Sequence, residues 1–481
     1  MLLLIILAIL AALSYLTNPF TRLSIIRRPF VVEAAAETLH TIKESHKLTV
    51  RQGRLWRTFA VMMCGFHILE TRYLNSPRAR GYTASGIAMS IHELRFDPKK
   101  LLVVSGDHFS ALFVRNLGVF YYPLLDDRIP GSDTDWRNRQ TVYLQTVAYA
   151  LGVFAKHPVP ATTIVPTGSY RATCVNFYAY PSDTVYGILY ALASLLGEQN
   201  GGYAGGAKKQ HALRTQVAAG ILQVQYRDTL CQLYDHYRTT VFDEAAGLVR
   251  KDIHLSGAKD ITKRSSAFYD NVVFWKTTQL AGLLGLITPD ERFLEKLKAR
   301  ILETFWLETD GHFLEDLSDE GVEQRYYSSD WLIVLSAGFL SPLVKAERHY
   351  FERSFQYIQK HGIDQPFALK YQHETRAGRQ FLPVRLAVAS YGGDAIWSFW
   401  GMEYIKTLLL LHKQTGGRSY LREADFQIAA YEKNMVRDGG FPEVYDRKGK
   451  MLVTPFYKSI RQTGWVIGFE QVQVMRKEVA L

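Results

Sequence analysis

Apolar residues recur along most of the chain with the period of an α-helix. From about Leu55 onward they fall at i, i+3, i+4 and i+7, the spacing that puts them on one helix face. This spacing predicts helices over 143–157, 184–197, 213–237, 274–287, 290–306, 395–416 and 420–436. Alternation with period two, which predicts strands, is rare. We therefore expect a mostly α-helical protein.

The segments between these helices repeat a chemistry of aromatic residues with Asp, Asn and Gly. Examples are SGDHF, FYDN, YYSSDW, YGGD and DGGFPEVYD. Asp, Asn and Gly are ordinary turn formers, so turns alone would explain them. Turns do not usually need so many rings, whereas carboxylates that bind hydroxyls and rings that stack on apolar faces suit a sugar. Alternating helices and such loops favour helical hairpins that close into an α/α toroid, with the loops at one end.

Composition narrows the class of protein. The 481 residues are 47% hydrophobic and no Pro/Ser-rich linker divides them, which favours one large domain over residues 55–481. The net charge of +11 is scattered rather than gathered in a basic stripe, so we expect no nucleic-acid partner. Three distant cysteines, Cys64, Cys174 and Cys231, indicate buried thiols and no disulfide or metal site.

The amino terminus differs from the rest of the chain. Residues 1–20 begin with sixteen residues that carry no charge, MLLLIILAILAALSYL, close to the shortest length that spans a bilayer. No Lys or Arg precedes this run, while Arg22, Arg27 and Arg28 follow it in the basic linker, residues 21–54. The positive-inside rule then predicts a single membrane anchor with the main domain in the cytoplasm. An exported protein with a signal-like segment is the alternative.

Two carboxylic acids stand among aromatic residues, where a charge should be costly. Asp270 lies in AFYDNVVFW, whose rings should raise its pKa, the direction that a general acid needs. The same residue could instead cap the following helix. Glu443 lies in DGGFPEVYD with no adjacent Lys or Arg, as a general base would. Inverting glycoside hydrolysis needs two such groups, about 6.5–9.5 Å apart.

The order of these loops resembles the six-hairpin glycosidases, in the clan of mannosylglycerate and glucosylglycerate hydrolases, processing α-glucosidase I and the glucosidase half of glycogen debranching enzyme. SGDHFSALFVRNLG is similar to an early loop that binds the sugar. AFYDNVVFW resembles the general-acid loop, and GGDAIWSFWGMEYI resembles the start of a later helix. GGFPEVYDRKGKML is similar to the loop that carries the general base.

The resemblance implies an (α/α)6 toroid and an inverting hydrolase of an α-glucoside or α-mannoside, with Asp270 as general acid and Glu443 as general base. No metal or cofactor is needed for this chemistry. YYSSDW adds Trp331 as a candidate for a plus subsite, although a helix cap would explain that loop equally. The residues expected to bind the carbohydrate are Asp107, Phe109, Arg115, Tyr269, Asn271, Trp331, Asp394, Trp397, Trp400 and Tyr445.

The chain also departs from the family pattern. VVFW follows Asp270-Asn271 where the family usually has Ser-Pro-Arg, and Ser398 and Met402 stand where it tends to have Pro and Asn. Either the substrate differs, or the toroid is kept as a glycan-binding protein without hydrolysis. A polysaccharide lyase on a similar toroid is a further alternative, since the positive charge would suit an acidic glycan.

Overall fold

The computed structural model describes residues 42–43, 45, 47–73, 78–96, 106, 111–168, 170–176, 179–197, 207–255 and 257–479. The predicted anchor, residues 1–20, lies outside these residues, and so do Asp107 and Phe109. Within the described part, none of the helices combines the length and the apolar character needed to cross a bilayer. The boundary between linker and domain at residue 54 stays a prediction.

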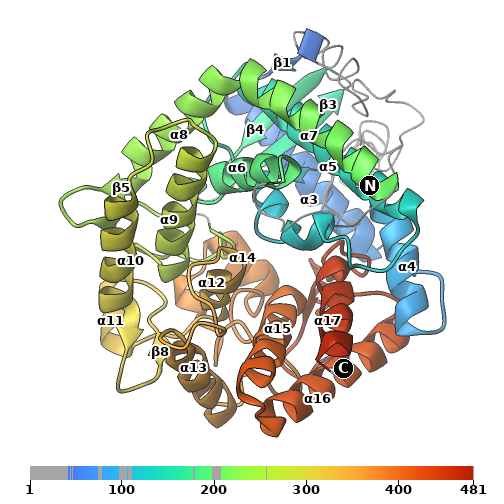
Figure 1. Cartoon of the computed structure of the whole chain (residues 1–481), viewed down its shortest axis with the longest axis vertical. Helices are drawn as coiled ribbons and strands as arrows, with labels where there is room; N and C mark the ends of the chain where they lie inside the picture. Colours follow the sequence, from blue (N-terminus) through green and yellow to red (C-terminus); the bar gives the residue numbers. More distant parts are fainter. Residues whose placement is uncertain are drawn as a thin grey trace, which may run out of the picture.

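An inner ring of helical segments surrounds the centre of the molecule (Figure 1). Each member packs on the next, and the last packs on the first, which closes the ring. In order, the members are η1 and η2 (Val114–Leu117 and Tyr122–Leu125), α6 (Thr184–Leu195), α9 (Phe268–Leu283), η3 and α12 (Ser329–Leu332 and Ile333–Ser336), α15 (Ser398–Thr415) and α17 (Val466–Glu478).

An outer layer of helices alternates with the inner ring along the chain (Figure 1). It consists of α4 (Ala84–Arg95), α5 (Asp133–Phe154), α7 (Ala207–Gln225), α8 (Arg227–Val241), α10 (Glu291–Phe305), α13 (Arg348–Lys360) and α16 (Arg418–Asp438). The final inner helix, α17, packs against α4 near the start of the described chain. The predicted (α/α)6 toroid is thereby confirmed.

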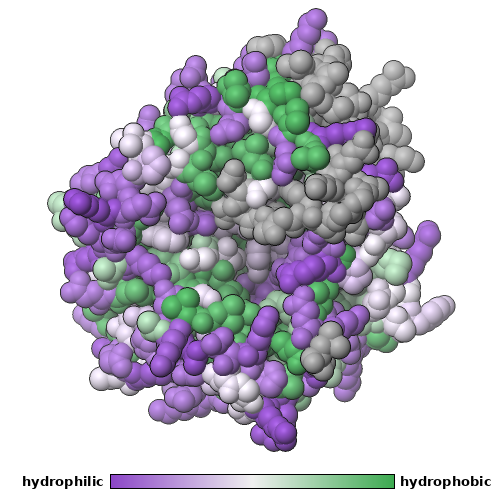
Figure 2. Space-filling model, viewed as in Figure 1, coloured by the Kyte–Doolittle hydropathy of each residue, from purple (hydrophilic) through white to green (hydrophobic). Residues whose placement is uncertain are grey.

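Burial explains which helices line the ring. Every residue of α6 is buried, and α9 and α15 are buried along most of their length, since neighbours contact them on all sides. In α10 the buried residues are Leu294, Leu297, Ile301 and Phe305, which form one stripe, while the other face meets water. The face of the molecule in Figure 2 is mostly hydrophilic, with hydrophobic residues in separate patches.

Short strands and further helices connect these layers. A sheet of order β1-β4-β3-β2 lies beside α3 (Arg54–Tyr73). Its strands are β1 (Thr49–Val50), β2 (Leu112–Phe113), β3 (Thr163–Gly168) and β4 (Arg171–Val175). Three two-stranded pairs are β5 with β6 (Phe242–Asp243, Leu248–Val249), β7 with β8 (Trp306–Leu307, His312–Phe313) and β9 with β10 (Ile396–Trp397, Val444–Tyr445). The remaining helices are α11 (Asp319–Gln324), η4 (Ala377–Arg379) and α14 (Leu382–Val388).

Three helix predictions need correction. Helix α5 begins at Asp133, ten residues before the start predicted at 143. The predicted helix over 213–237 is two helices, because the chain leaves helical geometry at Tyr226, whose hydroxyl shares a hydrogen bond of 2.7 Å with Ser45 Oγ. Helix α9 begins at Phe268, six residues before the predicted start, so Asp270 lies inside its first turn. The three cysteines are free; Cys64 and Cys174 are buried, as predicted, whereas Cys231 is half-buried.

Candidate active site

Glu443 is fixed beside the start of α15 by an antiparallel pair of short strands, β9 and β10. Helix α16 ends at Asp438, and Gly439 follows with a φ of 61°, a conformation that favours glycine. Gly440 also cannot carry a side chain, because a Cβ there would lie 2.3 Å from the Arg461 carbonyl oxygen. Strand β10 then pairs antiparallel with β9, with Val444 opposite Trp397. The pairing brings Glu443 next to the start of α15, where Ser398 N donates to its carbonyl oxygen at 3.1 Å.

The Glu443 carboxyl group is buried and held by two phenols. The Tyr391 hydroxyl donates to Oε1 at 3.1 Å, and the Tyr457 hydroxyl donates to Oε2 at 2.9 Å. Burial raises the pKa of Glu443 to about 7, against the opposing effect of these two hydrogen bonds. Glu443 can therefore exchange a proton near neutral pH, as an acid–base catalyst must.

A cavity of about 480 Å³ opens in front of Glu443. Its polar end is formed, among the described residues, by Arg115, Asn116, Asp260, Trp397, Glu443 and Trp465, together with the two phenols. The Trp397 and Trp465 rings lie 5.7 Å apart in a stacked arrangement. The structure thus brings three predicted site residues, Arg115, Trp397 and Glu443, to one cavity of a size usual for small-molecule ligands.

Arg115 joins Asp260, which lines the cavity, to the fully buried Asp183. Its guanidinium donates to Asp260 Oδ2 at 2.5 Å and to the Gly257 carbonyl oxygen at 2.7 Å, and it lies 3.8 Å from Asp183 Oδ2. Although burial opposes it, the charges of Asp260 and Asp183 raise the pKa of Arg115. A fixed positive charge therefore stands at the polar end of the cavity.

Asp270 occupies the third position of α9, near its N-terminus. The cap residue is Ala267, so the interpretation of Asp270 as the N-cap is wrong. The residue is 1% exposed, and its carboxyl group accepts a hydrogen bond of 2.6 Å from Ser182 Oγ. Burial raises the pKa of Asp270 to about 6, and the Arg264 guanidinium opposes this rise. The sequence predicted a raised pKa for Asp270, and the structure agrees in direction.

Asp270 is not among the described residues that line the cavity. The segment 257–264 stands between the two. A Cβ on Gly257 would lie 2.7 Å from Asp270 Oδ1, so this backbone packs directly on the carboxyl. On its other side the same segment lines the cavity with Ala258, Asp260 and Ile261. The two candidate catalytic groups thus lie on opposite sides of one loop.

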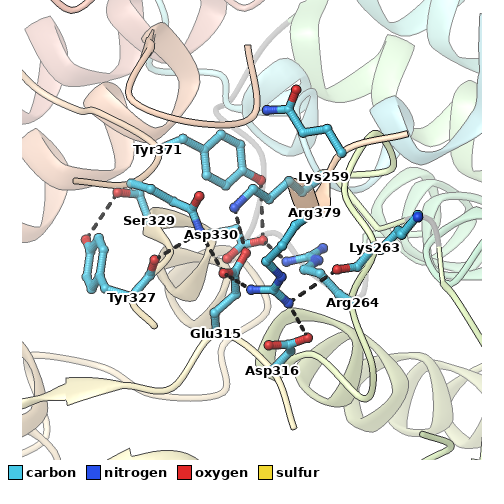
Figure 3. A network of polar contacts seen from close by, with 12 residues as sticks. Lys259, Lys263, Arg264, Glu315, Asp316, Tyr327, Ser329, Asp330, Tyr371 and Arg379 are labelled. Atoms are coloured by element: carbon cyan, nitrogen blue, oxygen red, sulfur yellow. Dashed lines mark hydrogen bonds and ion pairs between the residues drawn. The ribbon is translucent and has the colours of Figure 1, made fainter. Parts of the chain in front are cut away.

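A network of buried charges continues from this loop (Figure 3). Lys259 Nζ donates to Glu315 Oε1 at 2.6 Å, and Arg379 binds both Glu315 and Asp316. Although burial opposes it, the Lys259 and Arg379 charges lower the pKa of Glu315 to about 2. Every charge named here has an opposite partner, which makes its burial tolerable.

A second ion pair of the same network lies beside Asp270. Arg264 donates to Asp330 Oδ2 at 2.6 Å, and the Tyr371 hydroxyl donates to the same oxygen at 3.3 Å (Figure 3). Arg264 belongs to the segment that covers Asp270, so its ion pair with Asp330 anchors that segment.

Several predicted site residues serve the scaffold in this structure. The Asn271 side chain accepts from Val249 N at 2.9 Å and donates to the Ala267 carbonyl oxygen at 2.8 Å. Tyr269 donates from its hydroxyl to Asp183 Oδ2 at 3.0 Å. Trp331 donates from its indole to the Tyr327 hydroxyl at 3.2 Å.

Three further predicted residues lie outside the described cavity lining. Trp400 and Tyr445 are 0% exposed and pack among other rings. Asp394 accepts from Thr375 Oγ1 at 2.7 Å and lies 3.9 Å from Arg447.

The residues expected from the sequence to form the site did not include five that surround them: Asp183, Asp260, Tyr391, Tyr457 and Trp465. Tyr391 directly precedes the GGD loop and was within reach of the argument about aromatic loops. Asp183 immediately precedes a predicted helix, where an acid is ordinary. Asp260 follows GAK, which has neither aromatic residues nor a recognisable motif. Their roles depend on loop packing that the local sequence does not encode.

The sequence predicted neither a metal site nor a cofactor. Over residues 42–479, as far as they are described, His, Cys, Asp and Glu form no group of three or more that could hold a metal ion. Asp133 and Asp135 of the acidic loop LLDDRIPGSDTDW lie in the first turn of α5, where Asp135 and Ser132 form a capping box.

Comparisons with known proteins give structural matches only. No family model and no curated protein matches the chain. The chain is structurally similar to six-hairpin toroid proteins. A GH63 mannosylglycerate hydrolase from Thermus thermophilus, in complex with glucose, matches with a TM-score of 0.49 at 12% identity, over 81% of this chain and 99% of that chain.

Two other matches are sugar isomerases or epimerases. A cellobiose 2-epimerase from Spirochaeta thermophila has a TM-score of 0.48 at 11% identity, over 82% of this chain and 97% of that chain. A D-mannose isomerase has a TM-score of 0.47 at 11% identity, over 82% of this chain and 96% of that chain. At this level of identity no residue role or substrate is carried over.

Proposed function

We propose that this chain is a glycoside hydrolase of the inverting type that acts on an α-glucoside or α-mannoside, with Glu443 as general base and Asp270 as general acid. The observation that carries the proposal is Glu443 itself. It is a buried carboxyl group that faces a ligand-sized cavity, beside the Trp397 ring and a fixed cation, and its pKa is raised to about 7.

The chemistry assigns one proton transfer to each carboxyl group. Glu443, ionised, takes a proton from a water molecule as the water oxygen bonds to the anomeric carbon. Asp270, protonated, gives its proton to the glycosidic oxygen as that bond breaks. The two tryptophan rings would pack on the apolar face of the sugar, and Arg115 would donate to its hydroxyls.

Asp270 can take this role only if the segment 257–264 moves aside when the sugar binds, since Gly257 packs on its carboxyl. Asp260 is the other candidate for the second carboxyl group, because it lines the same cavity as Glu443. Asp260 forms an ion pair with Arg115, and in this arrangement Asp260 is the base and Glu443 the acid.

The test compares Glu443→Gln, Asp270→Asn and Asp260→Asn on a panel of α-glucosides and α-mannosides. We expect Glu443→Gln to lose at least roughly 100-fold in kcat, the usual contribution of an acid–base group. Loss in Asp270→Asn identifies Asp270 as the acid; loss in Asp260→Asn alone identifies Asp260 as the partner. Normal hydrolysis by Glu443→Gln, or a product with an ultraviolet-absorbing double bond, would contradict the proposal.

The burial of Asp270 beneath Gly257 favours a second candidate, a glycan-binding toroid without hydrolysis. In that case calorimetry would detect sugar binding by the wild-type protein, and no reducing sugar would be released from any glycoside of the panel.

A further inference from the structure

The cavity in front of Glu443 has two unlike ends. Its polar end carries the charged side chains of Arg115, Asp260 and Glu443. Away from them, the described walls come from α3, from α14 and from Phe456 in the loop before Tyr457, and they are almost wholly apolar. The proposed function uses only the polar end.

The α3 wall is one face of a helix. Val61, Cys64, Gly65, Ile68 and Leu69 line the cavity, and their spacing of i, i+3, i+4, i+7 and i+8 places them on a single stripe. Such a stripe usually packs against another element of the core. Here the stripe lines the cavity, and Val61 keeps 40% of its surface exposed.

Helix α14 supplies a second wall through Pro383, Val384, Ala387 and Val388. Next to this wall, large apolar side chains reach the surface: Leu386 is 71% exposed and Phe456 is 56% exposed. An apolar lining that continues outward into exposed apolar side chains is typical of a binding site for an apolar group.

Hydrogen bonds tie these walls together. Thr454 Oγ1 donates to the Ala387 carbonyl oxygen at 2.9 Å, and Arg72 Nε donates to the Thr454 carbonyl oxygen at 2.7 Å. The loop that carries Phe456 is therefore fixed to both α14 and α3. The apolar end is built before any ligand arrives, which reduces the entropy lost on binding.

We propose that this apolar end binds the aglycone of an amphiphilic glycoside, an alkyl or isoprenoid chain, while its sugar lies at the Glu443 end. The inference rests on the proposed function and adds the substrate class. A second sugar is a poor occupant, because its hydroxyl groups would lose their hydrogen bonds to water and find few partners along these walls. A hydrocarbon chain has no hydrogen bonds to lose, and the burial of its apolar surface favours binding.

Substitution of Gly65 tests whether a hydrocarbon chain occupies the apolar end of the cavity. A Cβ at this position would meet no heavy atom within 4 Å, although Gly65 lines the cavity. The Cβ of Gly65→Leu therefore meets no neighbouring atom, and the leucine side chain extends from a residue that lines the space assigned to the hydrocarbon chain. Leucine also has the higher helix propensity, so α3 should be kept. Gly220→Leu in α7 is the matched control, since a Cβ there would meet only Leu196, at 3.9 Å.

Binding is measured separately from hydrolysis, with 1-thio-α-glucosides and 1-thio-α-mannosides that carry methyl, butyl, hexyl or octyl groups. Titration calorimetry below the micelle concentration gives their Kd. We expect roughly fourfold tighter binding for each buried methylene in the wild-type protein and in Gly220→Leu. Gly65→Leu should bind the methyl glycosides normally and lose the dependence on chain length.

The result that overturns the inference is an affinity that does not change with chain length, or a dependence that persists unchanged in Gly65→Leu. The proposed function fails separately, if the oxygen-linked octyl glycosides are bound with the chain-length dependence and never hydrolysed. Hydrolysis of methyl and octyl glycosides with equal kcat/KM would keep the proposed function and refute the assignment of the aglycone.

Discussion

The Tyr457 hydroxyl donates a hydrogen bond of 2.9 Å to Glu443 Oε2, while the carboxyl group that accepts it is buried at the end of a cavity. The hydrogen bond favours the ionised form of Glu443, and burial favours the protonated form. The balance raises the pKa of Glu443 to about 7, where a small change in the surroundings alters its protonation.

Removal of that hydrogen bond should shift the pH dependence of activity. In Tyr457→Phe the ionised form of Glu443 loses a donor, so the pKa of Glu443 rises, by roughly one unit for a hydrogen bond to a charged group. The limb of the pH profile of kcat/KM that belongs to Glu443 should move to higher pH. Tyr420→Phe in α16 is the control and should leave the profile in place. A Tyr457→Phe profile that coincides with the wild type would contradict this account.

The wild-type pH profile should be a narrow bell. The pKa values of Asp270 and Glu443 are raised to about 6 and about 7, in both cases because burial penalises the charge. Below pH 6 both groups are protonated and no base is left; above pH 7 both are ionised and no acid is left. Between these values the pair holds one proton, and the productive form, with Asp270 protonated and Glu443 ionised, is about a tenth of that singly protonated pair because Glu443 has the higher pKa. We therefore expect kcat/KM to peak between about pH 6 and pH 7. A plateau that extends to pH 9 would exclude this pair.

Asp270 should also make stability depend on pH. Its pKa is about 6 in the folded protein and about 4 in an unfolded chain, so its stabilising contribution is complete below pH 4 and is lost as pH rises through 6. Asp270→Asn removes this pH-dependent loss of stability, because the amide does not ionise. Its side-chain oxygen can still accept the Ser182 hydrogen bond. Relative to wild type, the variant should therefore gain about 3 kcal/mol between pH 4 and pH 8.

Urea unfolding at the two pH values measures this difference. Asp235→Asn changes an exposed carboxylate on α8 and is the control, expected to alter stability equally at both pH values. Equal effects of Asp270→Asn at pH 4 and pH 8 would show that the carboxyl group is not penalised by burial.

The buried pair of Lys259 and Glu315 should respond strongly to the loss of one partner. Both side chains are 0% exposed, so Glu315→Gln leaves the Lys259 charge poorly compensated and should cost about 3–5 kcal/mol. The exposed pair of Arg300 and Glu303 is the control, where Glu303→Gln should cost less than about 1 kcal/mol. If Lys259→Met combined with Glu315→Gln costs as much as the sum of the single changes, the two charges are not coupled.

Most of the fold and part of the candidate site could be predicted from the sequence. Helix spacing predicted α6, α10, α15 and α16 closely, because burial of one face or of the whole helix leaves a direct imprint on the hydrophobic pattern. It did not predict the break at Tyr226, where the chain bends without proline or glycine. The glycines and aromatic residues around Glu443 marked a buried acid, which the structure contains.

The surroundings of Asp270 were less predictable. Its burial could be inferred from neighbouring rings, but the loop that covers it, residues 257–264, comes from a stretch without aromatic residues or a motif. Asn271 next to it was expected to bind substrate and instead bonds to Val249 N and the Ala267 carbonyl oxygen. Such contacts depend on which loops meet above the ring, a long-range property of the fold.

The ring is closed where α17, the last helix of the described chain, packs on η2 of the inner ring and on the outer helix α4, both near its beginning. During synthesis the intermediate hairpins can form in turn, but this closing contact must wait until nearly the whole domain has left the ribosome. Until then the apolar surfaces at the two open ends are exposed, the condition under which large proteins aggregate or recruit chaperones. Loss of α17 should therefore damage the yield of folded protein far more than loss of one helix from an open solenoid.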